Sequence, residues 1–448
     1  MFLSVVKLAR AGAVVTRIPF ERRIPYKSPA ALRGLRDKRV RRLVRYAATR
    51  VPYYIDLFAK HGIDPESIRS AEDLPRIPLL DKEALRQDPG RFVANGDSAR
   101  LLALETSGST GSPLTIYHDL ASIAANIART EPEKEVFREI FGSRRKRQMS
   151  ISYRGSAARA VQKACAQHVA LRPGRNTKFV EIDTPLDRIV SEINDHRPDL
   201  ISTYGSFLEL LFRYVTARGI EMHRPRAVLY GADMLTPSGR ELIERELAIT
   251  VLSTYSAVEA FRLGFTCGHG SAFHLRSDLC HVRTVDGAGA DVETGTAGEV
   301  VLTNLVNRGS ILINYRMGDM GTLSEKLCPC GRTLPLLESL EGRVEDIVLL
   351  GGGHHVHPRR IWQALKPTPG LIRYQLIQDE THRFRLKLVT VDDQAYPGTA
   401  AAAIASLRAL FGDAEITPEQ CSEIRTATGK FRPVVRALDI ESRSGAAR

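Results

Sequence analysis

Short apolar strands alternate with amphipathic helices in the middle of this 448-residue chain, and this alternation constrains its fold more than any other feature. The apolar segments 200–204 and 227–230 are each followed by a helical pattern, at 207–217 and 238–247. Another apolar segment follows at 250–254. Strand–helix repetition of this kind predicts an α/β domain with parallel strands.

The segments on either side of this region have other patterns. Residues 28–87 repeat apolar positions at helical spacing and predict a helical lead-in. After residue 298 the chain becomes rich in strand signals and glycine. The last part predicts a small α+β unit, with helices at 361–365 and 400–411 and a strand at 383–391.

The most plausible domain boundary lies at Gly342-Arg343-Val344-Glu345-Asp346. We therefore predict three parts: a helical lead-in over 1–98, a core domain over 99–342 and a C-terminal α+β lid over 343–448.

Composition excludes few classes of protein. Hydrophobic residues make up 43% and charged residues 26%, the ordinary balance of a globular protein. No apolar run is long enough to span a membrane, and the N-terminus lacks a clear cleavage site, so we expect neither a signal peptide nor a membrane partner. Six cysteines in so long a chain do not make a disulfide scaffold, and we expect a cytoplasmic protein.

The formal net charge is +13, with basic clusters at 38–42 and 144–147. Such runs are most often solvated surfaces; their functional alternative is an anionic partner, namely a nucleotide, coenzyme A or an acidic carrier protein. No nucleic-acid-binding motif accompanies the charge, so we expect no nucleic-acid partner. The oligomeric state, a homodimer included, stays open.

A glycine- and hydroxyl-rich stretch lies at 105–113, between two apolar segments. Glycines allow the backbone to approach a ligand closely, and backbone N–H groups and hydroxyls donate to phosphate oxygens. The stretch lacks the Gly-Lys-Ser/Thr of a P-loop. It predicts either a phosphate-binding loop between two strands or a simple hairpin turn.

Two acidic residues and two basic residues stand in motif-like surroundings downstream. Glu259 follows an apolar strand and is either a satisfied buried carboxylate or a ligand for Mg²⁺. Asp319 lies between two glycines, where it caps a turn or accepts hydrogen bonds from ribose hydroxyls. Arg343 and Lys430 follow, each beside a glycine. A surface role is the safer interpretation of that lysine alone.

In this order the segments resemble the core motifs of the ANL superfamily of adenylate-forming enzymes. They are most similar to its phenylacetate–CoA ligase (PaaK/CapK-like) family. The resemblance covers nearly the whole chain and includes the lead-in segments 46–54 and 73–75. It implies an ANL fold with a large N-terminal α/β domain and a small, mobile α+β C-terminal domain.

The resemblance also implies roles for single residues. Glu259 would bind Mg²⁺, Asp319 would bind the ribose with help from Arg343, and Lys430 would bridge the carboxylate and the α-phosphate. Glu345 would lie at the hinge about which the C-terminal domain rotates between two half-reactions. The nucleotide would contact the remaining positions: Ser107, Gly108, Ser109, Thr110 (near Mg²⁺), Gly111, Gly231, Ala232, Asp233 and Tyr255 (on the adenine).

The chain departs from the family pattern at four places. Val258 replaces a hydroxyl residue before Glu259, and Asn314 and Met317 replace the Arg and Thr of the motif around Asp319. The segment 354–357 is richer in histidine than usual, which fits a solvated loop better than a second metal site. These changes leave the identity of the substrate open, while the charged residues of the motifs remain.

Four residues in two segments suggest a structural metal site. Cys328 and Cys330 are one residue apart, and Cys267 lies near His269 and His274. Thiolate and imidazole groups from two short segments are typical zinc ligands, although Cys-x-Cys-Gly is tighter than the usual zinc knuckle. The family resemblance implies Zn²⁺ on Cys267, His274, Cys328 and Cys330; the alternative is free thiols.

The resemblance thus implies a ligase that uses ATP and Mg²⁺ to adenylate a carboxylic acid, of aromatic, phenylacetate-like type, and then transfers the acyl group to coenzyme A. Two alternatives remain. The acyl or AMP group could pass to a carrier protein, an amine or a cofactor, as in coenzyme F390 synthetase. The chain could also be a nucleotide-binding homologue without catalysis. Tyr153, Tyr204 and Phe207 are candidates for the walls of the acid pocket.

Overall fold

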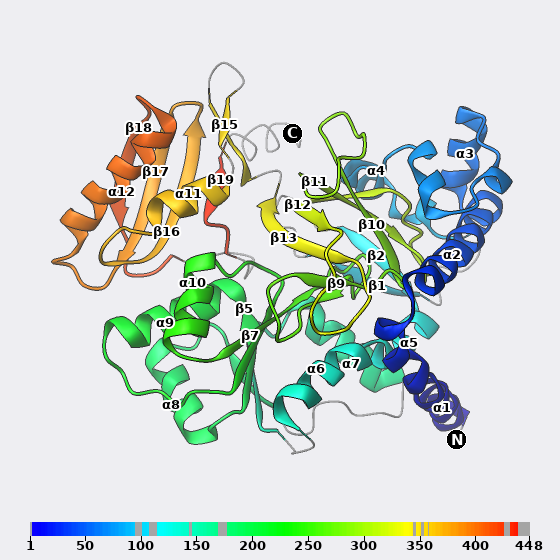
Figure 1. The fold of residues 1–448 in the computed structure, drawn as a ribbon, viewed down its shortest axis with the longest axis horizontal. Helices are drawn as coiled ribbons and strands as arrows, with labels where there is room; N and C mark the ends of the chain where they lie inside the picture. The colour runs from blue at the N-terminus through cyan, green and yellow to red at the C-terminus, as the bar shows by residue number, and fades with distance from the viewer. Residues whose placement is uncertain are drawn as a thin grey trace.

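The computed structural model describes residues 2–94, 101–106, 114–142, 146–168, 177–343, 346–350, 354–356, 358–424 and 431–437. Its described strands form two larger sheets, of 11 and 4 strands, and two separate two-stranded pairs, with helices packed around the larger sheets (Figure 1). The helices are α1 (Phe2–Arg23), α2 (Pro29–Arg50), α3 (Pro52–His61), α4 (Lys82–Gln87), α5 (Leu120–Arg129), α6 (Glu131–Phe141), α7 (Ala157–His168), α8 (Leu186–His196), α9 (Gly205–Ala217), α10 (Pro237–Glu241), α11 (Pro358–Leu365) and α12 (Tyr396–Phe411). Shorter turns are the 3-10 helices η1 (Ile24–Tyr26), η2 (Pro65–Ser67), η3 (Ala71–Arg76) and η4 (Pro89–Phe92), and the π-helix η6 (Leu242–Glu246).

A central 11-stranded sheet organises the N-terminal part, in the order β10-β11-β12-β13-β9-β8-β7-β6-β5-β3-β4. Its strands are β3 (Gln148–Ser152), β4 (Thr177–Glu181), β5 (Leu200–Tyr204), β6 (Ala227–Gly231), β7 (Thr250–Tyr255), β8 (Gly264–Phe265), β9 (Phe273–Leu275), β10 (Cys280–Val285), β11 (Ala297–Asn304), β12 (Tyr315–Ser324) and β13 (Leu336–Arg343). A separate hairpin pairs β1 (Leu101–Glu105) with β2 (Thr115–Asp119) in antiparallel register.

The predicted alternation of strands and helices forms one half of this sheet. Strands β3 to β7 are parallel, with α8, α9 and α10 between them in the sequence. Ile193 of α8 and Leu208 of α9 pack in one apolar core with strand residues such as Val228 of β6. Parallel strands need such crossover helices, because consecutive strands must return to the same end of the sheet.

The other half of the sheet departs from a purely parallel arrangement. From β8 onward all neighbouring strands are antiparallel, and β13 returns to pair with β9. This pairing brings the loop between β12 and β13 next to the loop between β8 and β9. The prediction of parallel strands is therefore confirmed for residues 148–255. The strands predicted after residue 298 are present, and they are antiparallel.

The C-terminal unit, which the sequence predicts to be a lid and which is called the lid below, has a sheet and a core of its own. Strands β16 (Leu371–Glu380), β17 (Arg383–Thr390), β18 (Glu415–Gln420) and β19 (Val434–Arg436) form a sheet in the order β18-β17-β16-β19. A small hairpin joins β14 (Val348–Leu349) and β15 (His355–Val356). Helices α11 and α12 pack on the larger sheet through Ile361, Ala403 and Leu407. Figure 1 shows this unit at the end of the molecule opposite α1 and α2.

Several contacts among the described residues join the lid to the N-terminal part. Helix α11 lies against β13, and α9 lies against β16. Lys366 and Glu241 form an ion pair across the junction, with Nζ 2.8 Å from the carboxylate. The space between these contacts is the cleft described below.

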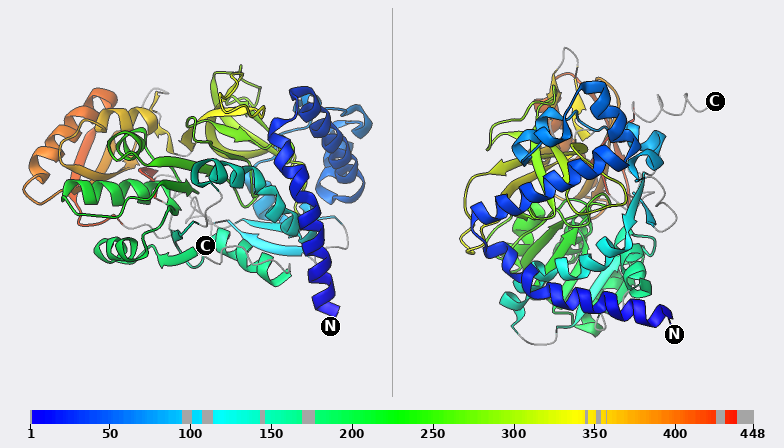
Figure 2. Two further views of the ribbon diagram at one scale, coloured as in Figure 1. Left: turned by 60° about the horizontal axis from the view of Figure 1, so that its bottom comes forward. Right: turned by 90° about the vertical axis from the view of Figure 1, so that its right-hand side faces the viewer.

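A buried ionic cluster, which the sequence did not predict, anchors α1 within the helical lead-in. Arg276 is fully buried, and its guanidinium group donates to Glu21 of α1 at 2.7 Å and to Asp278 at 2.9 Å. Buried charges are tolerated when they are paired and hydrogen-bonded. The C-terminal half of α1 is therefore fixed to the core, although the helix projects from the body of the molecule (Figure 2). No helix among the described residues is long and apolar enough to cross a membrane.

Gly205, at the start of α9, allows a close approach between two segments beside the cleft. A Cβ atom at this position would lie 2.4 Å from the backbone nitrogen of Leu235. We expect Gly205→Ala to lower the free energy of unfolding by about 1–3 kcal/mol, because the backbone must shift to relieve the contact. Gly34→Ala is the control, since its Cβ meets no atom within 4 Å in the middle of α2 and alanine favours helix. Denaturant unfolding measures both; equal stability of Gly205→Ala and the parent would contradict the packing.

Candidate functional site

A large cleft opens between the N-terminal part and the lid. Its volume is about 1990 Å³, which exceeds the roughly 300–1,000 Å³ of a drug-sized pocket. The walls come from the ends of the parallel strands, from β12 and β13, and from lid residues such as Trp362, Arg373 and Phe431. The position fits the rule that ligands bind beyond the carboxyl ends of parallel strands.

Asp319, Arg343 and Tyr255 meet in this cleft. Asp319 on β12 is the register partner of Arg343 on β13, and the two side chains approach to 3.7 Å. The hydroxyl of Tyr255, at the end of β7, donates to Asp319 Oδ2 at 2.8 Å. Burial, followed by the charge of Asp319, raises the pKa of Tyr255 well above its usual value, so this hydroxyl keeps its proton. Asp319 accordingly presents an oriented carboxylate to a ligand.

Glu259 lies in the same wall and is held by two partners that the sequence interpretation missed. Tyr315 donates its hydroxyl hydrogen to Glu259 Oε1 at 3.3 Å. The side chain of Asn304 donates to the backbone carbonyl of Glu259 at 2.8 Å. Tyr315 thus holds the carboxylate and Asn304 holds the backbone of Glu259, a residue that is almost fully buried yet lines the cleft. A tethered carboxylate of this kind suits a hard cation such as Mg²⁺.

Gly231 ends β6, and Ala232 and Asp233 make the bend that follows it. Ala232 adopts a positive φ of 70°, which lets the chain reverse sharply at the strand end. Asp233 accepts a hydrogen bond from the backbone N–H of Ser206 at 3.2 Å, and it also accepts from the Ser206 hydroxyl. All three residues line the cleft, so the structure brings this predicted segment into the same site as Tyr255 and Asp319.

The acidity of Asp233 predicts a pH effect on stability. Burial raises its pKa to about 6, although the hydrogen bonds from Ser206 favour the carboxylate. In the unfolded chain the pKa of an aspartate is about 3.9. Between about pH 4 and pH 6 the folded state therefore binds more protons than the unfolded state, and the free energy of unfolding falls as the pH rises. The free energy of unfolding of Asp233→Asn should therefore rise by about 1–3 kcal/mol relative to that of the parent as the pH goes from 4 to 7.

Melting temperatures at the two pH values measure this effect. Asp195→Asn, at an exposed position of α8, is the matched control and should track the parent at both pH values. A stability difference between Asp233→Asn and the parent that does not change with pH would contradict the assignment.

The glycine-rich segment lies between two strands, as predicted. Strands β1 and β2 flank it in an antiparallel pair, and Thr106 closes its base by a backbone hydrogen bond to Leu114 and by accepting another at its hydroxyl. Its central residues, Ser107, Gly108, Ser109, Thr110 and Gly111, lie outside the described residues. Thr106 and Leu114 line the cleft, so both ends of the segment face the site.

Lys430 and Glu345 also lie outside the described residues, while their neighbours do not. Arg432 donates to Asp346 Oδ1 at 2.7 Å, and both residues line the cleft. This ion pair joins two segments: the one that follows the predicted hinge at Glu345 and the one that follows Lys430. The roles of Lys430 and Glu345 stay predictions.

Two of the residues that depart from the family motifs, Val258 and Asn314, make hydrogen bonds with distant segments. The backbone carbonyl of Val258 lies 2.8 Å from Nε2 of His118, whose ring stacks on Phe261. Asn314 is fully buried, and its amide donates to the backbone carbonyls of Leu74 and Ile77 at 2.7 and 2.6 Å. Asn314 therefore fastens the helical lead-in to β12. Met317 lines the cleft.

The side chains suggested for the acid pocket separate into two groups. Tyr153 and Tyr204 line the cleft and meet edge to face, with ring centroids 5.8 Å apart. Phe207 packs in the core behind β5. Arg373 of the lid, which the sequence interpretation missed, lies over the Phe431 ring at 3.7 Å and also lines the cleft.

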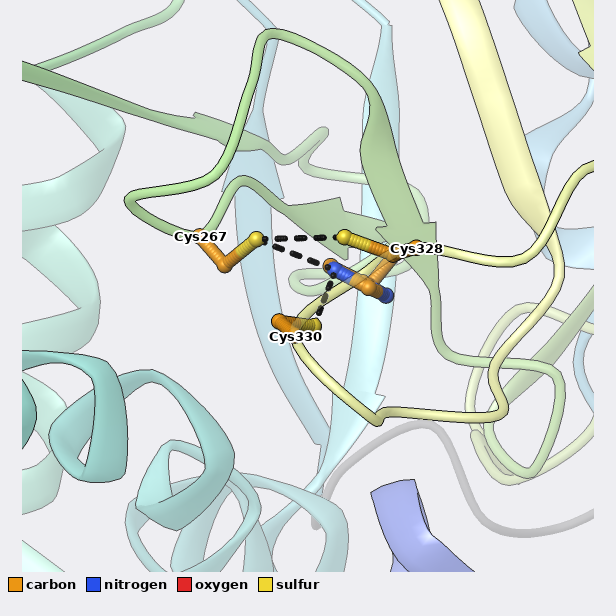
Figure 3. A group of neighbouring side chains, drawn as sticks. Cys267, Cys328 and Cys330 are labelled. Atoms are coloured by element: carbon orange, nitrogen blue, oxygen red, sulfur yellow. Dashed lines mark hydrogen bonds between the residues drawn. The ribbon is translucent and has the colours of Figure 1, made fainter.

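The four predicted metal ligands converge on one point away from the cleft. His274 lies on β9, Cys267 in the loop before it, and Cys328 and Cys330 in the loop between β12 and β13. Their ligand atoms all lie within 4.8 Å of one another. Cys267 Sγ is 3.5 Å from Cys328 Sγ, and His274 Nε2 is 3.4 Å from the sulfur atoms of both Cys267 and Cys330 (Figure 3).

These distances fit the edges of a small tetrahedron. Zinc with bonds of about 2.3 Å to sulfur and about 2.0 Å to nitrogen sets its ligands roughly 3.5–3.8 Å apart. The chemical set, three thiols and one imidazole, is that of a closed structural site. His269, also close in sequence, is not part of the cluster.

Comparison with known proteins agrees with this geometry. No protein-family model matches the chain. The phenylacetate–coenzyme A ligase of Thermus thermophilus is 29% identical over 372 residues, which cover 77% of this chain and 78% of that enzyme. The chain is a relative of the phenylacetate–coenzyme A ligases. The corresponding ligase of Aromatoleum evansii is 24% identical over 371 residues, which cover 78% of each chain.

Solved structures show the fold of this ligase relative. A 2-hydroxyisobutyryl-CoA ligase in its postadenylation state superposes with a TM-score of 0.74 at 18% identity, covering 95% of this chain and 93% of that one. The same ligase in its thioesterification state gives a TM-score of 0.60, with similar coverage. The fold is that of the ANL adenylate-forming enzymes, and the postadenylation arrangement matches it better than the thioesterification arrangement.

Proposed function

We propose that this phenylacetate–coenzyme A ligase relative uses ATP to adenylate a carboxylic acid and transfers the acyl group to coenzyme A. The observation that carries the proposal is the joint placement of Asp319, Arg343, Tyr255 and Glu259 in one cleft, which both ends of the glycine-rich segment also line. The curated relatives carry the name of this reaction.

In the first half-reaction the carboxylate attacks the α-phosphate of ATP, an acyl-adenylate forms and pyrophosphate leaves. Asp319, oriented by Tyr255, accepts the ribose hydroxyl hydrogens, and Arg343 beside it adds positive charge. Lys430 offsets the repulsion between two anions as they approach and stabilises the charge that develops. Glu259 would hold Mg²⁺, which neutralises phosphate charge when it is bound.

In the second half-reaction the thiol of coenzyme A attacks the acyl carbonyl, and AMP leaves. We infer that the lid turns about Glu345 between the two steps, since a few hinge residues can absorb such a motion. The higher similarity to a postadenylation structure supports assigning the present lid position to the first step. Residues 1–98, 99–342 and 343–448 are the parts that we assign to the lead-in, the core and the lid.

We propose an aromatic, phenylacetate-like acid as the substrate. The edge-to-face pair of Tyr153 and Tyr204 in the cleft and the names of the curated relatives support this choice. A carrier protein, an amine or a cofactor as the acceptor remains an outcome that the experiment below distinguishes. A cytoplasmic location stays a prediction.

We also propose that Cys267, His274, Cys328 and Cys330 hold a structural Zn²⁺. The ion would join the loop between β8 and β9 to the loop between β12 and β13, and it would take no part in the reaction, because none of its four ligands lines the cleft.

The test is acid-dependent pyrophosphate release from ATP and Mg²⁺ across a panel of aryl and short aliphatic acids, with and without coenzyme A. We expect release with arylacetic acids and loss of free thiol when coenzyme A is present. Release without thiol loss would show another acceptor. ATP binding without release on any acid would point to a homologue without catalysis.

A further inference from the structure

The positive charge of the molecule is concentrated at one end of the chain. Residues 1–50 contain 14 lysines and arginines and 2 acidic residues, a net charge of +12 out of +13 for the whole protein. The other 398 residues are almost neutral. Such asymmetry within one chain indicates an anionic partner for the charged part.

This basic end is remote from the proposed active site. Residues 1–50 form α1, η1 and α2, which lie at the end of the molecule opposite the lid (Figure 1). No residue of this segment lines the cleft. The charge therefore serves neither the nucleotide nor an acceptor that must reach the cleft.

Much of the charge is not neutralised within the protein. Several basic residues are paired, as Arg22 is with Glu131 and Arg45 with Glu66. Five exposed basic residues have no acidic partner among the described residues, namely Arg23, Arg33, Lys38, Arg42 and Arg50. Lys38 and Arg42 are one helical turn apart on the outer face of α2, so their charges add toward solvent.

The same end exposes apolar side chains. Val14 and Ile18 of α1 pack against α5, and the opposite face of α1 is solvent-exposed. That outer face consists mainly of small or apolar residues, namely Ala9, Gly12, Ala13, Val15, Thr16, Pro19 and Phe20. Val15 is 54% exposed, Phe20 40% and Tyr26 of η1 50%. A helix whose apolar face points outward beside basic residues has the composition of an element that lies in a lipid interface.

We propose that α1, η1 and α2 dock this protein on an anionic lipid surface, with Val15, Phe20 and Tyr26 entering the interface and the basic residues contacting lipid phosphates. Charge favours an anionic lipid surface over a second copy of the chain, because two such ends, each with a net charge of +12, would repel one another. The exposed aromatic and aliphatic groups decide for lipid over nucleic acid, whose backbone offers them no apolar layer. The proposal revises our expectation from sequence that the protein has no membrane partner.

The experiment is co-sedimentation of the full chain with vesicles of phosphatidylcholine alone or with about one third phosphatidylglycerol. We expect binding to the anionic vesicles only, with loss of binding at about 1 M salt, where the screening length falls to about 3 Å. Two double variants are compared: Val15→Ser with Phe20→Ser, and Lys38→Glu with Arg42→Glu. Each should weaken binding by roughly tenfold or more.

Matched variants separate a local effect from a general one. Arg188→Glu with Arg408→Glu changes the net charge equally, at exposed positions of α8 and α12. Leu349→Ser removes an exposed apolar side chain elsewhere. Both controls should bind vesicles as the parent does, and all variants should melt as the parent does.

Three results would overturn the proposal. The first is equal binding to neutral and anionic vesicles, or no binding to either. The second is a dimer in light scattering that dissociates in the variant Val15→Ser with Phe20→Ser, which would assign the face to a second copy. The third is tighter binding to RNA or DNA than to anionic vesicles, with the same loss in the variant Lys38→Glu with Arg42→Glu.

Discussion

Lys430→Ala should lose acid-dependent ATP–pyrophosphate exchange by about 10²–10³-fold or more. The reason is electrostatic: a carboxylate and a triphosphate are both anions, and without the lysine their approach and the developing charge lack a cation from the protein. The second half-reaction should survive, because the lysine is expected to leave the site before coenzyme A attacks. Thioester formation from a preformed acyl-adenylate is therefore expected at close to the parent's rate.

The two half-reactions are measured on the same preparation, which separates a catalytic defect from misfolding. Lys387→Ala, on β17 of the lid and outside the cleft, is the matched control and should behave as the parent in both. Exchange by Lys430→Ala within a few-fold of the parent would refute the role of the lysine. Equal loss of both half-reactions would refute the rotation of the lid.

Cys328→Ser should lose the metal that we assign to the four-ligand cluster and destabilise the protein markedly. Structural zinc sites contribute several kcal/mol to folding, because the site does not exist in the unfolded chain. For a domain of this size we expect the melting temperature to fall by about 5–10 °C. Elemental analysis of the parent should find about one zinc per chain, and a strong chelator should reproduce the loss of stability.

Cys421→Ser is the control for this substitution, since Cys421 is a free thiol of the lid outside the cluster. It should keep the zinc and the melting temperature of the parent. A parent protein that contains no zinc when purified without chelators, or a Cys328→Ser variant that melts as the parent does, would refute the site.

The parallel half of the sheet is predictable from sequence for a simple reason. Each strand there is followed by its own crossover helix, so local patterns such as 200–204 and 207–217 carry the topology. The antiparallel half lacks such a link. Nothing local in residues 336–343 shows that they pair with both β12 and β9, because the register depends on packing between distant segments.

The residues of the candidate site were likewise only partly predictable from the sequence. Motif resemblance identified Glu259, Asp319 and Arg343, and the structure places all three in one cleft. The partners that orient them were not predictable, because Tyr315 is 56 residues from Glu259 and an isolated tyrosine before an arginine reads as an ordinary strand residue. Asn314, a departure from the family motif, is explained by its contacts with the backbone of the lead-in.

Helix α1 shows the limit of periodicity. Its inward face carries the buried Glu21 as well as the apolar Val14 and Ile18, while its outward face is also mainly small or apolar, so apolar periodicity alone does not show which side faces the core. A buried cluster with Arg276, 255 residues away in sequence, holds the polar side of the helix inside. No window of sequence contains both members of that pair.

The most direct test of the central claim is mass-spectrometric analysis of a reaction that contains ATP, Mg²⁺, an arylacetic acid and coenzyme A. We predict arylacetyl-CoA and AMP in equal amounts, with no product when the acid is omitted. AMP and pyrophosphate without any acyl-CoA would contradict transfer to coenzyme A. ADP in place of AMP would contradict adenylation itself.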